Sequence, residues 1–429
     1  MKKQVDTLEE RIHVGLDIGT TKIAMVAGRL NGDGKLEILG HQIVQSKGVR
    51  RGTVINVQKT VDGLKELKMK MLKDFGIEVG IVHLGIAGKY IESLNIEHSI
   101  IRKNPNNMIT GQEINDFLET VKQMLKQPGR DVIHIIPQEY TINDESGITD
   151  PIGAVGSRLS CKIHAAVANI SAIEMLKNCV SMADMDIADI MLEPLASAEA
   201  VLEEQEKEGG VVLVDIGGGT TDIAIIKENI IRHVCVIPFG GEAVTEDLKN
   251  GLSLLKEEAE LCKVNYGNAI PADVNPNEVI AFQAMKNCPQ REFSLRAISE
   301  IISARMSEIL ETVNYEINIS NVTMPLIGGI VLTGGGSLIK NTSQLSSYIT
   351  GLPSRVGTPN HLLSHDTSSY LLSPQYSTAI GLLLNAIKND YNQIILNNRV
   401  NENKVDGIKE KKQKKYKFDI WGNLSNFFD

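Results

Sequence analysis

Paired apolar runs around a short polar turn occur twice along this chain. Residues 12–16 and 23–27 flank the first turn, and residues 211–214 and 223–226 flank the second. An apolar run, a tight turn rich in glycine and threonine, and a second apolar run are typical of a β-hairpin. An aspartate directly follows the first run of each pair. The pattern therefore predicts two similar hairpins, each with a carboxylate at the end of its first strand.

The segment around the first turn predicts a β-meander, a helix and a further strand. Strand-like runs alternate with turns over residues 14–43. Apolar residues at helical spacing then extend from Val57 to Phe75, and Gly76 is expected to cap this helix at its C-terminal end. Residues 81–87 are expected to form another strand.

The pattern changes over residues 86–164, which we interpret as an inserted α+β subdomain. Several short strand-like runs surround one clear helix, which is predicted over residues 110–125. Thr110 is expected to be its N-cap residue, and Glu113 is expected to complete a capping box.

The second half of the chain predicts a larger helical part. Residues 242–319 are largely helical in pattern, with an interruption around residues 271–277. A strand over residues 327–332 leads into a third glycine-rich turn. Further helices are predicted over residues 171–183, 195–208 and 377–388.

Composition places the chain among soluble globular proteins. Of its 429 residues, 42% are hydrophobic and 23% are charged, and the length allows two or more lobes with their own cores. No apolar run approaches the ~18 residues that a membrane span needs, and the first residues are too polar for a signal peptide. Five dispersed cysteines without a C-x-x-C pair predict reduced thiols, with neither a disulfide framework nor a zinc site: Cys161, Cys179, Cys235, Cys262 and Cys288.

Charge is distributed unevenly along the chain. The formal net charge is −9, yet residues 409–417 carry six lysines and a single glutamate. The rest of the chain is therefore acidic. An acidic body argues against nucleic acid as a partner, because nucleic-acid binding needs a basic face on the folded domain.

The two turns have the chemistry of an anion and metal site. Residues 17–22 read Asp-Ile-Gly-Thr-Thr-Lys, and residues 215–222 read Asp-Ile-Gly-Gly-Gly-Thr-Thr-Asp. Glycine lets backbone N–H groups approach an anion closely, and threonine hydroxyls add donors. One such hairpin can be an ordinary turn. Two of them, each led by an aspartate, predict a duplicated fold that holds a polyphosphate and its metal ion from both sides. The sequence contains neither the P-loop pattern nor the G-x-G-x-x-G fingerprint, so those folds are not expected.

Three glycine-rich turns that each follow a strand, and an E-x-x-K pair on a helix, resemble the actin-like ATPase superfamily. The fold class expected is therefore α/β, with two RNase-H-like lobes around a nucleotide cleft. The resemblance implies ATP and Mg²⁺ as cofactors, with Asp17 and Asp215 holding the metal ion through its waters. The other residues implied in nucleotide binding are Gly19, Thr20, Thr21, Lys22, Gly217, Gly218, Gly219, Thr220, Thr221, Gly240, Gly241, Glu260, Lys263, Gly334, Gly335, Gly336 and Ser337.

Glu193 is the candidate catalytic residue. Residues 193–197 resemble the helix start that carries a water-orienting carboxylate in the chaperone branch of the superfamily. The resemblance implies that Glu193 positions a water near the γ-phosphate. A glutamate before a proline at a helix start is also a common partner of the helix dipole, and the sequence leaves both interpretations open.

Four stretches together resemble the FtsA family of bacterial cell-division proteins. They are residues 46–56, 85–88, 134–140 and 150–153, and the match extends over roughly residues 12–388. The resemblance implies an ATP-binding, actin-like filament protein that anchors the tubulin-like polymer FtsZ at the division site. It implies a peripheral location on the cytoplasmic side of the inner membrane, slow ATP hydrolysis at most, and three kinds of protein partner: FtsZ, further copies of the chain and other division proteins.

Arg305 and Glu308 fall where this family carries a charged pair for the FtsZ contact. The alternative is an i,i+3 ion pair on a solvated helix face, which contributes only tenths of a kcal/mol. The expected division of the chain is a first lobe (12–85 and 165–205), the inserted subdomain (86–164), a second lobe (206–388, with 242–319 mostly helical), a flexible basic linker (389–417) and an amphipathic helix (418–429).

The last twelve residues have the spacing of an amphipathic helix. They lie beyond the predicted linker and beside the lysine cluster, a combination that suits the interface of an anionic bilayer. The alternatives are a peptide that docks on a partner and a tail that folds back on the body. The residues predicted to contact the membrane are Phe418, Ile420, Trp421, Leu424, Phe427 and Phe428.

Other members of the same superfamily remain as alternative functions. A sugar-type kinase would need a base for the substrate hydroxyl, and a lysine-flanked aromatic tail would serve no purpose in it. A chaperone-type ATPase would carry a long peptide-binding domain after the ATPase body. A pilus-assembly actin homologue would resemble the body but use a different tail.

Overall fold

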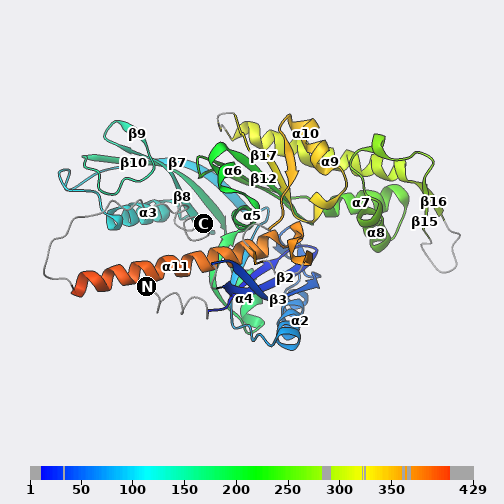
Figure 1. Ribbon diagram of the computed structural model, residues 1–429, viewed down its shortest axis with the longest axis horizontal. Helices are drawn as coiled ribbons and strands as arrows, with labels where there is room; N and C mark the ends of the chain where they lie inside the picture. The colour runs from blue at the N-terminus through cyan, green and yellow to red at the C-terminus, as the bar shows by residue number, and fades with distance from the viewer. Residues whose placement is uncertain are drawn as a thin grey trace.

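Two five-stranded sheets with the same strand order form the two lobes of the molecule (Figure 1). The structure is a computed structural model. It describes residues 11–31, 34–282, 291–320, 322, 325–359, 363–364 and 369–405. In Figure 1 the inserted subdomain lies at one end of the long axis and the helical subdomain of the second lobe at the other.

The sheet of the first lobe has the order β11-β6-β1-β2-β3. Its first three strands in chain order form an antiparallel meander, and β6 and β11 continue the sheet in parallel from β1. The predicted meander and first hairpin are confirmed. The strands are β1 (His13–Ile18), β2 (Lys22–Leu30), β3 (Leu36–Gln45), β6 (Ile81–Ile86) and β11 (Asp186–Leu192).

The sheet of the second lobe repeats this arrangement with the order β14-β13-β12-β17-β18. Three strands again form an antiparallel meander, and two parallel strands follow on the side of the first. The shared order and directions identify the two lobes as copies of one structural unit, as the paired hairpins predict. The strands are β12 (Val211–Ile216), β13 (Thr221–Lys227), β14 (Ile230–Ile237), β17 (Gly329–Thr333) and β18 (Ser354–Val356).

Helices cover both faces of the first sheet, and two of them lie between the lobes. The helix α2 (Val57–Phe75) and α4 (Ile170–Met182) cover one face, while α5 (Glu193–Val201) and α11 (Ser377–Val405) cover the other. One buried apolar cluster includes side chains from α5, α11 and both sheets, so the lobes share a core. As predicted, Gly76 caps α2, in the left-handed conformation that glycine tolerates best.

A close helix crossing joins α5 to α11. A Cβ added at Gly381 would lie 1.7 Å from the carbonyl oxygen of Ala196, so only glycine allows the two backbones to approach this closely. Glu193 stands at the first position of α5, and Thr378 stands at the start of α11. The crossing therefore fixes the relative positions of two helix starts that reach the cleft.

The inserted subdomain has a sheet and a core of its own. Its strand order is β7-β10-β8-β9, and α3 (Gly111–Leu125) packs on it. Thr110 is the N-cap of α3, as predicted, because its side chain accepts a hydrogen bond from the Glu113 N–H. The Glu113 carboxylate accepts from the Thr110 backbone N–H, as in the predicted capping box, and it also pairs with the buried guanidinium of Arg102, at 2.7 and 2.9 Å. The strands are β7 (Ile91–Ile101), β8 (Arg130–Ile142), β9 (Glu145–Ile148) and β10 (Arg158–Asn169).

The helical subdomain of the second lobe contains a strand pair that the sequence pattern does not predict. Its helices are α7 (Gly241–Leu252), α8 (Lys256–Tyr266) and α9 (Leu295–Ile319), and β15 (Val279–Phe282) pairs with β16 (Arg291–Ser294). These strands are four residues each, too short for a clear alternating pattern. The remaining elements are β4 (Val49–Arg50), β5 (Thr53–Val54), α6 (Glu204–Gly209), α10 (Thr342–Thr350) and the 3₁₀ turns η1 (Pro271–Asp273), η2 (Gly335–Leu338), η3 (Ser369–Leu372) and η4 (Pro374–Tyr376).

Two helix boundaries differ from the predicted ones. The helix predicted over residues 195–208 is divided into α5 and α6, because Leu202 and Glu203 are extended and the side chains of Glu203 and Glu206 form a capping box that starts α6. The last helix continues to Val405, into the segment predicted as a flexible linker. Residues 389–405 contain no proline or glycine that would stop it.

The rest of the predicted linker, residues 406–417, and the whole tail lie outside the described residues. The membrane-contact prediction for Phe418, Ile420, Trp421, Leu424, Phe427 and Phe428 therefore stays a prediction. Among the described helices, none combines the length and the apolar character that crossing a membrane requires.

Candidate functional site

The two aspartate-led turns have the same backbone design. In the first lobe the Gly19 N–H donates to the Lys22 carbonyl at 3.0 Å, and in the second the Gly217 N–H donates to the Thr220 carbonyl at 2.9 Å. In each turn the donor glycine is the first residue after the strand that carries the aspartate. Asp17 and Asp215 therefore occupy equivalent positions in the two lobes.

The tips of the two turns meet. A Cβ added at Gly218 would lie 2.4 Å from Cγ2 of Thr21, and one added at Gly219 would lie 2.2 Å from Oγ1 of Thr20. Carbon atoms do not approach this closely without strain, so the contact requires glycine at both positions. The glycines of the second turn thus let the lobes close against the threonines of the first.

Both turns line one cavity of about 270 Å³. Most of the residues predicted to bind nucleotide lie on its wall, together with the candidate catalytic residue Glu193. The predicted residues on the wall are Asp17, Gly19, Thr20, Thr21, Lys22, Glu193, Asp215, Gly217, Gly218, Gly219, Thr220, Gly241, Glu260, Lys263, Gly334, Gly335 and Gly336.

Three other residues of the predicted set lie behind the wall. The Thr221 hydroxyl donates to the Phe239 carbonyl at 2.9 Å, and the Ser337 hydroxyl donates to the Gly334 carbonyl at 2.7 Å. Gly240 stacks on the second turn, where an added Cβ would lie 2.5 Å from the Gly217 carbonyl. These residues support the turns and do not face the cavity.

Four carboxyl groups gather in the cavity wall: Asp17, Glu193, Asp215 and Asp222. Burial raises the pKa of all four, and for Glu193 and Asp222 the raised pKa lies well above the ordinary value. The other carboxyl groups raise the pKa of Glu193 further, because like charges disfavour ionisation. Such a cluster can bind protons or a cation. If all four groups were ionised with no cation bound, the buried like charges would destabilise the folded protein.

Asp222 is the member of this cluster that the predicted site omits. Its Oδ1 is buried without a hydrogen-bond partner among the described residues, and its Oδ2 accepts from the Thr220 hydroxyl at 3.2 Å. An unpartnered carboxylate oxygen beside three other carboxyl groups fits a hydrated divalent cation, which offers water protons to such an oxygen. The signal was present in the sequence, because Asp222 is the last residue of the second glycine-rich motif.

Asp215 is held by hydroxyl groups from two helices. Its Oδ2 accepts from Ser197 Oγ of α5 at 2.6 Å and from Thr378 Oγ1 of α11 at 3.3 Å. A Cβ at Gly334 would lie 2.2 Å from Oδ1, so the third glycine-rich turn passes directly beside this carboxylate. Ser197 and Thr378 orient Asp215, and neither was in the predicted site.

Lys22 is the cation at the other side of the cluster. Its Nζ lies 3.6 Å from Asp17 Oδ2, donates to the Gln375 carbonyl, and lies 5.5 Å from the centre of the Tyr376 ring. Gln375 also lines the cavity. Gln375 lies in η4, outside the glycine-rich motifs in sequence, which is why local patterns do not identify it.

Glu260 and Lys263 lie together on α8, as their spacing predicts. Lys263 Nζ lies 2.8 Å from Glu260 Oε2 and donates to the Gly241 carbonyl at 3.0 Å and to Thr245 Oγ1 at 2.9 Å. Both residues face the cavity. The pair therefore presents one donor and one acceptor on the side of the second lobe.

Two family models match parts of this chain. The family model described as Cell division protein FtsA matches residues 212–381, and a second one, described as SHS2 domain inserted in FTSA, matches residues 88–167. The FtsA of Pseudomonas aeruginosa is 35% identical over 371 residues, which cover 86% of this chain and 88% of that protein. The FtsA of Escherichia coli K12 is 30% identical, over 88% of this chain and 91% of that protein.

This chain belongs to the FtsA family of cell division proteins. The match to the inserted domain overlaps the predicted subdomain 86–164. The structure also resembles solved actin-like proteins. It matches a PilM-PilN type IV pilus biogenesis complex with a TM-score of 0.64 and 15% identity, over 87% of this chain and 98% of that one. It matches MreB5 of Spiroplasma citri bound to ADP with a TM-score of 0.52 and 18% identity, over 90% and 99%. The actin-like fold class is confirmed.

In this FtsA-family chain, Arg305 and Glu308 pair on α9, but Arg305 has a second partner. Its guanidinium contacts Asp247 of α7 through two bonds, at 2.6 and 3.1 Å, and also pairs with Glu308. The Asp247 carboxylate raises the pKa of Arg305. These contacts give Arg305 a role in joining two helices, and its role in partner binding stays a prediction.

Proposed function

We propose that this FtsA-family protein binds Mg-ATP in the cleft between its lobes. The observation that carries the proposal is the meeting of the two aspartate-led turns on one cavity, with four carboxyl groups beside them. A cleft of this kind offers backbone donors for phosphate from both lobes and carboxylates for a hydrated metal ion. The ADP-bound MreB5 has the same fold, which agrees with the proposal.

Each wall of the cleft would contact a different part of the nucleotide. The turns at residues 19–22 and 217–220 would contact the β- and γ-phosphates, and residues 334–336 would pass beside the α-phosphate. Glu260 and Lys263 would bind the ribose and adenine. Asp17 and Asp215 would hold Mg²⁺ through its waters, and the bound ion would neutralise charge on the phosphates.

Glu193 would orient a water toward the terminal phosphate. Its pKa is raised well above the ordinary value by burial and by Asp17, Asp222 and Asp215. A raised pKa favours the protonated form of the carboxyl group, and that form cannot accept a proton from water. The arrangement supports binding and slow turnover better than fast hydrolysis.

We further propose the established role of the family for this chain: self-assembly, attachment to the inner membrane face and anchoring of the FtsZ polymer. The family relationship and the amphipathic, lysine-flanked tail support it. MamK, solved as a double helical filament, shares the fold with a TM-score of 0.50. A single short tail binds membrane reversibly, so stable attachment would need many copies in a filament.

Nucleotide binding is tested by calorimetry with ATP, with Mg²⁺ present and with Mg²⁺ chelated. Wild-type protein is expected to bind ATP more tightly with Mg²⁺, and Asp215→Asn is expected to lose that difference. Arg305→Ala, which changes a residue away from the cleft, is the control. Equal ATP binding with and without Mg²⁺ in the wild-type protein would contradict the proposed metal site.

Membrane attachment is tested by flotation with anionic vesicles. The full chain is expected to float and a truncation to residues 1–408 to stay at the bottom of the gradient. A full-length Trp421→Ala, Phe427→Ala variant keeps the lysines and separates apolar insertion from charge attraction. Equal flotation of the full and truncated chains would refute the membrane role of the tail.

A further inference from the structure

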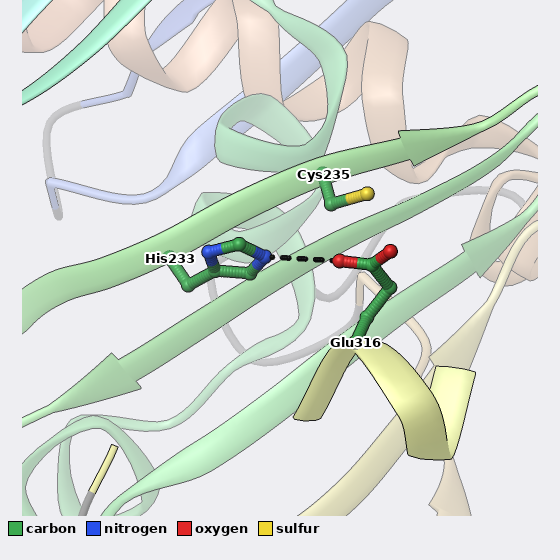
Figure 2. A group of neighbouring side chains, drawn as sticks. All are labelled: His233, Cys235 and Glu316. Atoms are coloured by element: carbon green, nitrogen blue, oxygen red, sulfur yellow. Dashed lines mark hydrogen bonds and ion pairs between the residues drawn. The ribbon is translucent and has the colours of Figure 1, made fainter. Parts of the chain in front are cut away.

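A second group of metal-ligating side chains lies outside the cleft, on the second lobe. His233 and Cys235 of β14 and Glu316 of α9 each offer one ligand atom, and these atoms lie within 4.8 Å of one another. Figure 2 shows the three side chains converging, with the two strand residues facing the carboxylate that extends from the helix. Two structural elements thus bring together an imidazole, a thiol and a carboxylate.

The fold places these side chains on one face for a simple reason. His233 and Cys235 are two residues apart on a strand, so both point to the same side of the sheet. Ile237 shares that side and is buried in the cluster that includes Val313 and Ile317 of α9. Glu316 lies between these two helix positions and therefore stands at the edge of the same packed interface.

The contacts within the group leave ligand atoms available. His233 Nε2 lies 3.3 Å from Glu316 Oε2, which is long for a strong hydrogen bond. Cys235 is in no disulfide, and its thiol hydrogen-bonds Glu316, so a bound ion would replace the thiol proton between them. The side chains of His233 and Glu316 are 13% and 16% exposed, so an ion can reach them from solvent while most of their surface is fixed by packing.

We propose that His233, Cys235 and Glu316 form a binding site for a divalent transition-metal ion of the zinc class. Imidazole nitrogen, thiolate sulfur and carboxylate oxygen are the ligand types that Zn²⁺ accepts in proteins, usually with four ligands in a tetrahedron. Three protein ligands leave a fourth position for water. Mg²⁺ is not expected to compete, since it prefers six oxygen ligands.

The site lies directly beneath the junction between the second lobe and the inserted subdomain. Ser93 Oγ donates to the Val234 carbonyl, and Gln138 Nε2 donates to the carbonyls of Ile231 and Arg232 at 2.8 and 3.0 Å. All three acceptors are on β14, the strand that carries His233 and Cys235. A bound ion would therefore fix the strand to which the inserted subdomain is attached.

One histidine of the inserted subdomain touches this site. The ring of His164 lies 6.2 Å from the ring of His233, in an edge-to-face arrangement. His164 is fully buried, its Nδ1 lies 2.7 Å from Asn95 Oδ1, and its Nε2 has no hydrogen-bond partner within the described part of the chain. An ion on His233 would hold the ring against which His164 packs, and so would stiffen the contact between the two parts.

Sequence spacing alone gives no sign of this site. The His-x-Cys pair lacks the C-x-x-C pattern of common zinc motifs, and Glu316 is separated from it by the whole helical subdomain. The expectation of no zinc site rested on that missing pattern. The ligands come together only through the packing of α9 on β14.

The experiment is a Co²⁺ titration of tag-free, full-length protein that has been freed of metal and then saturated with Mg²⁺ to occupy the carboxylate cleft. Wild-type protein is expected to bind one equivalent of Co²⁺ with a sulfur-to-cobalt charge-transfer band, and Zn²⁺ is expected to displace it. Cys235→Ser should abolish the band. His233→Gln and Glu316→Gln should each weaken Co²⁺ binding by more than about 100-fold, because loss of even an outer partner of a ligand costs 10- to 100-fold.

Matched controls separate a ligand role from a general change in the protein. Cys262→Ser removes a buried thiol of the same lobe, and Glu311→Gln removes an exposed carboxylate of the same helix. Both should keep the wild-type band and affinity. The proposal is overturned if wild-type protein shows no thiolate band, if Cys235→Ser keeps it, or if the other two ligand variants bind Co²⁺ as the wild-type protein does.

A measurement on wild-type protein keeps the test decisive if a variant fails to fold. Zn²⁺ should protect Cys235 from alkylation and leave alkylation of the other thiols unchanged. It should also slow amide hydrogen exchange on β14 and at residues 93–95 of the inserted subdomain. Alkylation of Cys235 at the same rate with and without Zn²⁺ would overturn the proposal.

Discussion

The two lobes of this FtsA-family protein share a backbone plan but place different chemistry on it. Asp17 and Asp215 stand at the same register of equivalent strands, paired with Ala24 in the first lobe and with Asp222 in the second. Both turns contribute threonine hydroxyl groups, but the first adds the ammonium group of Lys22, whereas the second adds more glycines and an extra carboxylate, Asp222. The two lobes thus share one scaffold, and differences at single positions give the first turn a lysine and the second a further carboxyl group.

The largest expected effect concerns two buried carboxyl groups, Glu193 of the first lobe and Asp222 of the second, and depends on pH. Glu193 and Asp222 have raised folded-state pKa values, so above pH ~4 the folded metal-free protein retains protons that the unfolded chain has released. The free energy of unfolding should therefore fall as pH rises from ~4 toward the raised folded pKa values, by roughly 1 kcal/mol per pH unit for each retained proton. Urea unfolding at a series of pH values with Mg²⁺ chelated measures this slope.

Asp222→Asn supplies the control for the pH experiment. The amide does not titrate, so the slope should become shallower by one proton, and added Mg²⁺ should change stability less than in the wild-type protein. Ala24 occupies the equivalent place in the first lobe, and Ala24→Ser at that position should leave the slope unchanged. An equal slope in Asp222→Asn and wild-type protein would mean that Asp222 is not one of the groups that hold a proton.

The next effect concerns the contact between the two turns. Gly218→Val would place side-chain atoms where Thr21 lies, and overpacking of this kind costs about 1–3 kcal/mol. ATP affinity should fall by roughly 10- to 100-fold, as measured by calorimetry. Gly80→Ala, at a glycine whose added Cβ would meet nothing within 4 Å, should leave affinity unchanged. If Gly218→Val binds ATP normally, the turns do not need to meet.

A smaller effect is expected where the helices support the second aspartate. Ser197→Ala removes the 2.6 Å hydrogen bond to Asp215 and leaves Thr378 as the remaining hydroxyl partner. The loss should lower the free energy of unfolding by about 0.5–1.5 kcal/mol, since Thr378 still donates to the buried carboxyl group. The Ser343 hydroxyl donates to an exposed glutamine, so Ser343→Ala is the matched control, and thermal unfolding of both variants measures the difference.

The smallest effect is expected on α9. Glu308 is an exposed i,i+3 partner of Arg305, and Asp247 would still hold the guanidinium after Glu308→Ala. Stability should change by only about 0.2–0.5 kcal/mol. Co-sedimentation with FtsZ polymer provides the second readout. A clear loss of FtsZ binding with unchanged stability would assign Glu308 to the partner surface, while no change in binding would leave the ion pair as its whole role.

Local sequence patterns predicted the parts of the fold that depend on local chemistry. The hairpins, the cap at Gly76 and the N-cap at Thr110 follow from turn residues, helix-capping chemistry and periodic apolar positions, and the structure contains all of them. The α11 boundary was missed because asparagine-rich sequence weakens a helix without stopping it. The second partner of Glu113, the buried Arg102, was not predicted because the two residues come together only through packing of the inserted subdomain.

The candidate site divides in the same way. The glycine-rich turns are contiguous in sequence, so their contribution to the cavity could be predicted from residue types alone. Gln375 of η4 and Thr378 of α11 line the cavity, and Ser197 of α5 reaches Asp215 behind it, because α5 and α11 cross between the lobes. Tertiary packing sets such contacts, and no local pattern encodes them.

The crossing at Gly381 also lies near one end of α11, so the helix connects the cleft with a distant point of the molecule. Thr378 sits beside Asp215, three residues before the point where α11 presses on α5, and the helix then continues without a break to Val405. At 1.5 Å per residue, the part of the helix from Gly381 to Val405 is roughly 35 Å long. Figure 1 shows this part of α11 projecting past the first lobe. A tilt of a few degrees at the start of the helix, where the nucleotide would press, would displace its far end by roughly 2–3 Å.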